Sequence, residues 1–504
     1  SSDEERQLIW RYRDYVIRAM NRDLPYDTFV REQLAGDELS GYWDEYHAEE
    51  RLSEEVVEAL DATGFLRTGP DASRPDFNTI KNVKGLYYYP TIDAQLNILT
   101  SALMGITVKC AKCHNHKFDP LTQREYYRLQ SILMSAYNPD EWVPFRRRNR
   151  PIASRKQVEF AEQRAGEIEE RVAALKQEQQ KRQKEQREKL YHQRVAGTPE
   201  AMRADVLAAI AVTAERRNPL QKYLADKFAS YFRPPDDQLD AVLSEVFADY
   251  KRAVATNAEA IAAEQRRRVY FDYSYATYDV PGTPHTPLLR RGDAQTPGPV
   301  VQPGVPEMIR ALEPFSWRAP AEGAHSSGRR AALAEWLTQP RHPLTARVIV
   351  NRLWLHHFGE GILSTVDDFG WAGEDPTHRT LLDWLAVELE DGGWSLKRLH
   401  RSMVTSAAYR QRSSDGHPDA ERAEQIDPQN RLLWRQNLRR LEAEPLRDSI
   451  LAVSGGLLTN MFGRPIPVAT RSDGEVVVND GKLPQRRSVY LRNTRSAPLS
   501  ILQL

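Results

Sequence analysis

The sequence predicts a mainly α-helical protein of several domains. Apolar residues recur every three or four positions along most of the chain, as they do on the buried face of a helix; Tyr12, Tyr15 and Val16 are an example. Strand-like runs are confined to small β elements near 270–306 and 470–495. The length of 504 residues suggests a multi-domain protein of roughly two to four domains.

The first expected elements are helices. Helical spacing fills 1–60 with a break at Pro25, after which Asp27 is the expected N-cap of the next helix. The remainder of this region is expected to contain a loop at 64–90 and helices at 91–109 and 118–137.

Residues 155–194 carry apolar side chains at steps of four and three among many Glu, Gln, Lys and Arg residues. This pattern is typical of a helical or coiled-coil arm, through which the chain could self-associate, and equally of a solvated helix packed on the body. Weaker helical signals follow at 198–265, and the Pro- and Gly-rich stretch at 270–306 interrupts them. The elements expected after it are helices at 329–338, 343–358, 377–391, 395–411 and 435–454, and strands at 476–478 and 488–491.

The changes in residue pattern along the chain predict three domains, at 1–150, 151–268 and 269–504. The middle one is expected to be a helical or coiled-coil arm. Lys and Arg together number 70, as do Asp and Glu, so the formal charge is zero and gives no argument for nucleic acid as a partner. No apolar run reaches the roughly eighteen residues that a transmembrane helix needs.

The chain has two cysteines, and both lie in Cys110-Ala111-Lys112-Cys113-His114. Covalent attachment of haem c needs two thiols, which add to the two vinyl groups of the porphyrin, and an imidazole that binds the iron from the same turn. This short segment supplies all three groups. We therefore predict a c-type haem attachment segment with one covalent haem per chain and His114 as the proximal iron ligand.

Three alternatives remain for this segment. A zinc site could use Cys110, Cys113, His114 and His116, but adjacent side chains rarely reach one ion together and no second cysteine pair exists. A thioredoxin-like dithiol needs a βαβ context, which the flanking helical pattern does not offer. The third alternative is chance.

The second axial ligand must come from elsewhere in the chain. His116 is too close to His114 to reach the opposite face of the haem, and we expect it to bind a propionate or the backbone. Our first choice for the distal ligand is His356 or His357, since Trp354 and Phe358 beside them could exclude water. The other candidates are His378, His400, Met104 and Met403. An open sixth position would favour catalysis.

Polar residues of the last domain could also line a cleft with acid and base groups. This set comprises Asn351, Arg352, His356, His357, Asp367, Asp368, Glu374 and His378. The alternative is that such residues form the ion pairs that hold helices together. A network of that kind is expected for Arg440, Glu442, Glu444 and Arg447.

Several stretches resemble the planctomycete-type cytochrome-C-like proteins, which pair two domains of unknown function, 1549 and 1553. The stretches include Cys110–Tyr127, Pro25–Asp37, Arg291-Gly292-Asp293, Pro343–Arg352, His356–Gly359 and Asp368-Phe369-Gly370. The resemblance covers most of the chain. It implies an exported, haem-binding polypeptide, often with a further cytochrome domain ahead of this region, but it implies no substrate. It also implies that the partner domain is truncated after Leu504.

Together these observations predict a c-type haem protein in extracytoplasmic electron transfer or redox chemistry. The first alternative is a haem-dependent redox enzyme whose pocket is shared with the second domain, with carbohydrate as a candidate substrate. The second is a zinc-stabilised binding protein. The expected partner is a redox protein or an additional cytochrome domain. We expect a periplasmic or otherwise extracytoplasmic address, with a signal peptide encoded ahead of Ser1.

Overall fold

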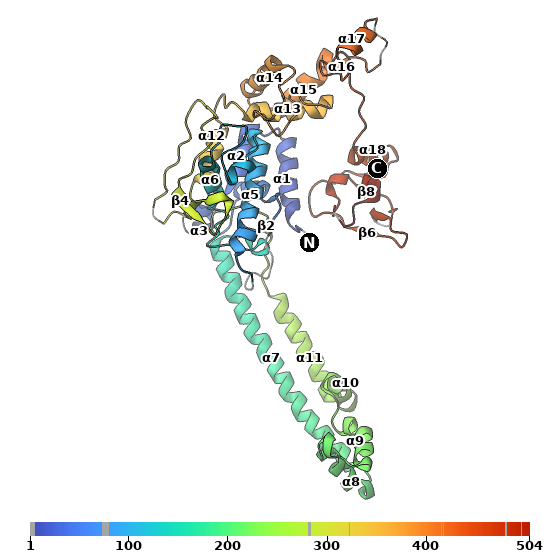
Figure 1. The fold of residues 1–504 in the computed structure, drawn as a ribbon. Helices are drawn as coiled ribbons and strands as arrows, with labels where there is room; N and C mark the ends of the chain where they lie inside the picture. The colour runs from blue at the N-terminus through green and yellow to red at the C-terminus, as the bar shows by residue number, and fades with distance from the viewer. Residues whose placement is uncertain are drawn as a thin grey trace. The chain divides into compact units, whose positions relative to one another are not determined.

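The computed structural model confirms a mainly helical protein with small strands. It describes residues 6–72, 80–280, 284–321, 323–414, 416, 418–478, 481–494 and 496–503. The chain forms two compact units (Figure 1): Ser1–Ser154 with Asp272–Leu504, and Arg155–Phe271. The expected first and last segments thus pack together in one unit, here called the main unit, and the middle segment forms the other.

The main unit opens with helices, as predicted for 1–60. They are α1 (Ile9–Asn21), α2 (Tyr26–Leu39), α3 (Tyr42–Ala48) and α4 (Glu54–Ala62). The N-cap prediction was wrong, because α2 begins one residue before Asp27 and its N-cap position is Pro25. Asp27 lies in the first turn instead, where a carboxylate still favours the positive end of the helix dipole.

The next helices are α5 (Tyr89–Leu99) and α6 (Gln123–Leu133). The helix expected at 91–109 ends earlier, because Gly105 takes a left-handed conformation with φ of +58° after a π-helical turn at Thr100–Met104. Residues Lys109–Lys112 then form a separate 3₁₀ turn. The loop expected at 64–90 contains short helical turns at Thr63–Arg67 and Lys84–Tyr88, and its residues 73–79 lie outside the described residues.

The later part of the main unit is helical in most of the expected ranges, but the helix expected at 435–454 begins only at Ala443. Its helices are α12 (Arg329–Leu337), α13 (Thr345–Phe358), α14 (Arg379–Asp391), α15 (Leu396–Thr405), α16 (Ala407–Arg410), α17 (Ala420–Ile426) and α18 (Ala443–Val453). The helix expected at 395–411 is divided at Ser406, whose hydroxyl accepts the N–H of Tyr409 and caps α16.

Small strands occur near both expected regions. The antiparallel pairs are β1 (Arg150–Pro151) with β2 (Tyr273–Ser274), β3 (Thr286–Leu289) with β4 (Pro297–Val301), and β6 (Val468–Thr470) with β7 (Val476–Val478). β5 (Leu457–Leu458) pairs in parallel with β8 (Gln485–Arg486). The strand expected at 488–491 is instead a 3₁₀ turn at Ser488–Tyr490, which Asp448 holds by accepting the N–H of Ser488 at 2.8 Å.

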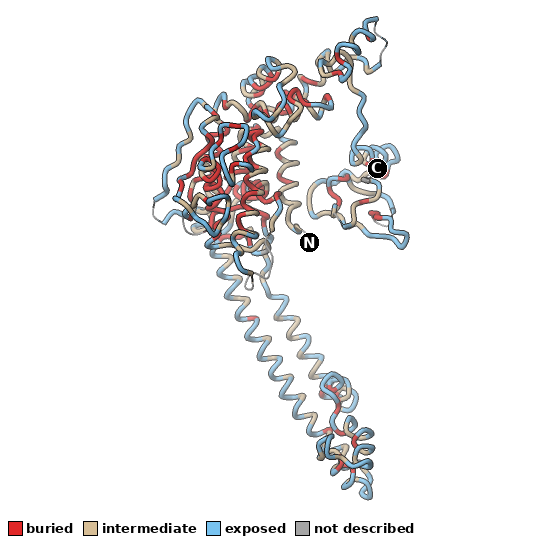
Figure 2. The backbone as a smooth tube through the Cα atoms, viewed as in Figure 1, coloured by how far each residue is buried: buried red, intermediate tan, exposed pale blue. Residues whose placement is uncertain are grey.

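One hydrophobic core runs through the main unit (Figure 2). It joins buried residues of α1, α2, α5 and α6 with those of α12, α13, α14 and α15. The core therefore combines helices from both ends of the sequence.

Arg330 at the start of α12 is fully buried at 0% exposure and joins three chain segments. Its guanidinium lies 2.7 Å from the Asp37 carboxylate, 3.1 Å from Glu38 and 2.8 Å from Asp279. One cation thus faces three carboxyl groups. Burial raises the pKa of Glu38 to about 8, and the neighbouring carboxylates Asp279 and Asp37 add to the rise while Arg330 opposes it. Glu38 is therefore protonated at neutral pH, which reduces the excess negative charge.

The second unit is helical throughout most of its length. It contains α7 (Arg155–Ala196), α8 (Glu200–Ala211), α9 (Pro219–Phe232), α10 (Asp236–Val246) and α11 (Ala248–Arg266). α7 spans 42 residues and contacts α11, α10 and α9. A small core forms around Leu190, Leu239, Leu243 and Tyr250. Coiled-coil pairing and self-association through 155–194 stay predictions. Among the residues described, no helix is long and apolar enough to cross a membrane.

The raised pKa of Glu38 predicts a pH-dependent stability. Between its unfolded pKa and about 8, the folded protein holds one more proton than the unfolded chain, so stability falls as pH rises through this window. We expect Glu38→Gln to remove that loss, which is on the order of 3 kcal/mol between pH 5 and pH 9. Urea unfolding at the two pH values measures it. Glu307→Gln at an exposed ion pair is the control, and parallel stability curves for wild type and Glu38→Gln would contradict the assignment.

Candidate functional site

The two cysteines lie at the surface in a single short turn. Cys110 and Cys113 are exposed, free thiols, and the Cys113 N–H donates to the Cys110 carbonyl at 3.4 Å. Val108, which precedes the two cysteines, and Ala111, which lies between them, are fully buried in the hydrophobic core. Because these apolar neighbours point inward, the turn directs both thiols outward.

Helix α6 holds this turn through the backbone of Lys112. The Lys112 carbonyl accepts hydrogen bonds from Gln123 Nε2 at 2.9 Å and from the Tyr127 hydroxyl at 3.0 Å. The same Gln123 amide donates to the Leu289 carbonyl at 3.1 Å. Lys112, which lies between the two cysteines, is therefore anchored to α6, and α6 is joined there to β3.

The Lys112 side chain is anchored as well. Its ammonium pairs with the carboxylate of Asp93 on α5, which also accepts the Tyr126 hydroxyl at 2.6 Å and the Gln130 amide at 3.0 Å. Burial raises the pKa of Tyr126 well above its usual range, and the Asp93 charge adds to this effect. Tyr126 is thus a neutral donor, and the Asp93 carboxylate is satisfied on all sides.

His114 follows the second cysteine and is exposed. Its Nδ1 lies 2.6 Å from the carbonyl oxygen of Asn115. A carbonyl can only accept, so Nδ1 carries a proton, and in the neutral imidazole Nε2 then keeps its lone pair. This is the tautomer of a histidine that binds a metal through Nε2. Asn115 is itself held, because its side-chain oxygen accepts the N–H of Gln123 at 2.9 Å.

His116 points the other way and is buried. Its Nδ1 accepts the backbone N–H of Asp119 at 3.0 Å and lies 3.2 Å from the Asp119 carboxylate. The backbone N–H of His116 donates to the Leu121 carbonyl at 2.8 Å. His116 therefore closes the loop after the cysteines. In the described part of the chain, no group of three or more His, Cys, Asp or Glu side chains is arranged to hold a metal ion.

A turn from the later part of the chain lies directly over Cys113. Arg291 and Gly292 both take positive φ, at +53° and +74°. A Cβ atom on Gly292 would lie 2.8 Å from the Cys113 sulfur, so any other residue here would have to displace the thiol or the backbone. The positive φ also favours glycine at this position.

A second segment reaches the loop that follows the cysteines. The Phe369 N–H donates to the Gly105 carbonyl at 2.6 Å, and the Trp371 N–H donates to the Asp119 carboxylate at 2.7 Å. Asp119 thus connects His116 with the backbone of Trp371. The Trp371 side chain is 83% exposed and that of Phe118 is 55% exposed, so two aromatic side chains stand at the surface beside this loop.

The histidines predicted as distal ligands lie at the end of α13. His356 is exposed, and His357 Nε2 is 2.7 Å from Nδ1 of His400 on α15. Burial lowers the pKa of His357, and neighbouring His400 lowers it further; burial also lowers the pKa of His400. Across the described residues, no hydrogen bond, ion pair or ring contact links these histidines to 109–116.

The other predicted polar residues mainly join helices and loops. Met104 and Met403 are buried in the core. Arg352 donates to the carbonyls of Ser101 and Ala102 and pairs with Asp367 at 2.8 Å. Further such contacts join Asn351 to Leu363, Glu374 to Arg431, and His378 to Thr377. The set thus makes contacts that hold the domain together.

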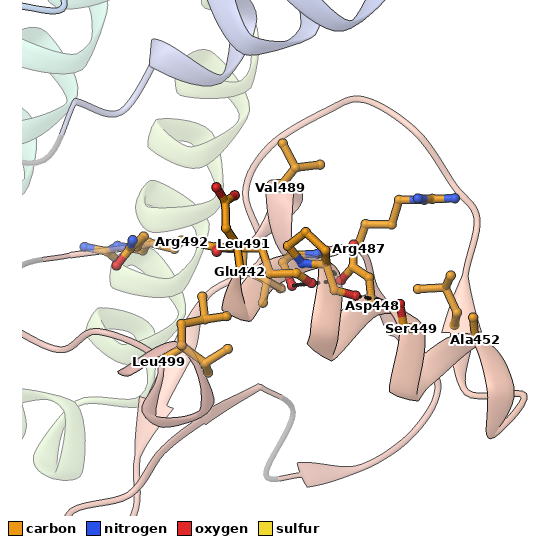
Figure 3. Close-up of a pocket in the computed structure, with 15 residues that line it drawn as sticks. Glu442, Asp448, Ser449, Ala452, Arg487, Val489, Leu491, Arg492 and Leu499 are labelled. Carbon is orange, nitrogen blue, oxygen red and sulfur yellow. Dashed lines mark hydrogen bonds between the residues drawn. The ribbon is translucent and has the colours of Figure 1, made fainter. Parts of the chain in front are cut away.

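A pocket of about 820 Å³ lies beside α18 (Figure 3). Carboxyl groups and guanidinium groups both line it, including Glu442, Asp448, Arg487 and Arg492. The ion-pair network expected here differs from the one observed, since Arg447 pairs with Asp448 at 3.3 Å and no ion pair within the described residues joins it to Glu442 or Glu444. None of the predicted haem-binding residues lines this pocket.

Two family models match the chain. The model PSCyt2, a protein of unknown function (DUF1549), matches residues 1–138, and the model PSD1, a protein of unknown function (DUF1553), matches residues 329–504. The chain therefore carries the pair of domains that is typical of planctomycete cytochrome-C-like proteins. The curated proteins and the solved structures gave no match to it.

The site draws on both matched regions and on the segment between them. The cysteines and histidines come from 1–138, Trp371 comes from 329–504, and Gly292 lies between. Sequence reasoning assigned no role to Gly292, Asp119 or Trp371. The resemblance included the motifs around Gly292 and Gly370, and this was a signal that these segments matter. It did not indicate the site, because their contacts are made by backbone atoms.

The approach of Gly292 to Cys113 predicts that replacing Gly292 lowers the free energy of unfolding, and that part of this loss depends on the Cys113 thiol. We expect Gly393→Ala, at φ of +71° with open space around it, to lose about 1 kcal/mol of stability from backbone strain. Gly292→Ala should lose about 1 kcal/mol more, because its methyl group meets the Cys113 sulfur. Denaturant unfolding measures both losses. Adding Cys113→Ala to Gly292→Ala should recover part of the excess, and equal losses at the two glycines would rule out the contact.

Proposed function

We propose that the chain is a c-type haem protein that acts in extracytoplasmic electron transfer or redox chemistry. The observation that supports this most is the arrangement of the two free, exposed thiols in one turn, followed by an exposed imidazole with a free Nε2. Covalent haem attachment requires these three groups in this order. The residues present therefore fit the group.

Each residue of the turn has a role in this proposal. Cys110 and Cys113 would hold the porphyrin through two thioether bonds, and His114 would bind the iron through Nε2. Asn115 orients His114 by accepting its Nδ1–H at 2.6 Å, which also raises the basicity of the ligand. Lys112, anchored by Asp93 on its side chain and by Gln123 on its carbonyl, keeps the two thiols at a constant spacing. When bound, the haem supplies a one-electron iron couple.

The second candidate function is a haem-dependent redox enzyme. It is favoured by the exposure of His114 and of both thiols, since segments of the later domain contact Cys113 and Asp119 but leave these groups open. An iron with an open position binds external ligands, while one with two protein ligands favours electron transfer. Addition of cyanide to the haem-loaded protein distinguishes the two functions, because rapid binding at low concentration indicates an open position.

We also propose that the protein matures outside the cytoplasm. Thioether attachment of haem depends on machinery linked to export. The two thiols must therefore stay unreacted until the chain has been exported. Fractionation of cells that express the full-length gene tests this. Haem-loaded protein in the cytoplasmic fraction would contradict the proposal.

The central prediction concerns covalent haem. Expressed with a cytochrome c maturation system and then denatured in acid, the protein should exceed its polypeptide mass by one haem. Cys110→Ala with Cys113→Ala should show the bare polypeptide mass, because no thioether can form. Intact mass spectrometry makes both measurements, and a bare mass for matured wild-type protein would rule out haem attachment at this segment.

A separate prediction concerns the distal ligand. If His356 or His357 binds the iron, alanine at that position should shift the Soret band and the spin state of the haem. His192→Ala, on α7 in the other unit, is the control and should leave the spectrum unchanged. Optical spectra of oxidised and reduced protein give the result. Unchanged spectra for both His356→Ala and His357→Ala would show that the pair does not bind the iron.

A further inference from the structure

The surface around the two cysteines carries unpaired positive charge. Five cations, here called the basic collar, are exposed there: Lys109, Lys117, Arg124, Arg290 and Arg291. Lys109 and Lys117 flank the cysteine turn in sequence, and Arg290 and Arg291 adjoin Gly292 above Cys113. Within the described residues, no ion pair joins any member of the collar to a carboxylate.

Three of the four neighbouring carboxylates are buried. Asp93 is 8% exposed and pairs with Lys112, Asp119 is 4% exposed and accepts from Trp371, and Glu125 is 6% exposed. Glu125 accepts the N–H groups of Thr122 and Glu307. Asp293 is exposed, and its carboxylate accepts the Gln295 N–H. The surface field at the cysteines is therefore positive, although the chain as a whole has a formal charge of zero.

Exposed aromatic side chains accompany this charge. Phe118 is 55% exposed with the Lys117 ammonium 5.1 Å from its ring centre, and Trp371 is 83% exposed on a backbone held by Asp119. Tryptophan and arginine are enriched at the centres of protein–protein interfaces, where lone exposed aromatics become buried. Cations mixed with exposed aromatic side chains fit a protein surface better than a simple ion site.

We infer that the basic collar, with Phe118 and Trp371, is the docking surface for an acidic redox protein. This inference rests on the proposed function, because electrons must enter or leave at the cysteine turn. Opposite charge on a partner steers the encounter and raises the association rate by roughly 10- to 1,000-fold at low ionic strength. Lys109 and Lys117 flank the attachment segment in sequence, and the other members adjoin Gly292 and Gln123, which contact it, so the steered partner arrives beside the haem.

The test uses a reduced plant-type ferredoxin as the acidic electron donor and the oxidised, haem-loaded protein as the acceptor. Stopped-flow mixing at low ionic strength gives the second-order rate of haem reduction. We expect Lys109→Glu with Arg290→Glu and Arg291→Glu to lower this rate at least ~10-fold. The wild-type rate should fall as salt is added, while the variant rate should change little.

A matched control keeps the change in net charge and moves it elsewhere. Lys181→Glu with Lys184→Glu and Lys222→Glu alters three exposed cations of the second unit, and its rate should stay within about twofold of wild type. Equal losses in the two triple variants would overturn the inference. If the collar variant does not fold, Lys117→Glu with Arg124→Glu provides the same comparison with two charges.

Failure of docking and failure of haem attachment give different results. Calorimetric titration of the polypeptide with oxidised ferredoxin needs no haem, so binding that weakens with salt supports the collar even if the mass shows no haem. Absence of binding by a haem-loaded wild-type protein would overturn the docking inference alone. Tight binding of dextran sulfate without any effect of the collar variant on ferredoxin reduction would also overturn it, and would indicate a polyanion as the ligand.

Discussion

The buried guanidinium of Arg330 joins the two family domains into one folded unit. Asp37 and Glu38 belong to the first matched region, Arg330 stands at the start of the second, and Asp279 lies between the matched regions. Removing one partner from a buried ion pair costs about 3–5 kcal/mol, because the remaining charge is left without compensation. Neither domain can therefore separate from the other without exposing or stranding these charges.

This union explains why the cysteine turn is built from distant parts of the chain. Helices α5 and α6 hold the turn through Asp93 and Gln123, while the turn around Gly292 approaches Cys113 and leaves it exposed. The loop at Trp371 then ties the segment after the cysteines to the second domain. A short sequence motif thus gains a definite orientation from three separate pieces of backbone.

The same packing determines the electrostatics of the site. Apolar residues beside the cysteines are buried in the core. Nearby carboxylates are buried with them, because they accept hydrogen bonds from N–H and hydroxyl groups that would otherwise lack an acceptor. Lysine and arginine side chains are long enough to keep their charges in water. The result is exposed thiols with exposed cations near them, and the positive charge arises because most nearby acids are buried, not because bases exceed acids in the composition.

Local sequence predicted most helices because their apolar spacing is long and regular, as in α1, α13 and α14. It failed where a single residue or a distant contact decided the outcome. Gly105 ended a helix early through its left-handed backbone, and Asp448 turned an expected strand at 488–491 into a tight turn by accepting the Ser488 N–H. Short apolar runs carry too little periodicity to resist such contacts.

The sequence by itself determined the mainly helical fold class, the family and the residues of the cysteine motif, because these depend on spacing within a few positions. Only the tertiary structure decided which later parts of the chain meet the cysteine turn and the loop that follows it. The sequence-based prediction looked for a histidine at His356 or His357, whereas the contacts found come from Gly292 and from the Trp371 backbone. Backbone atoms are the same in every residue, so their role in a site becomes visible only when the chain has folded.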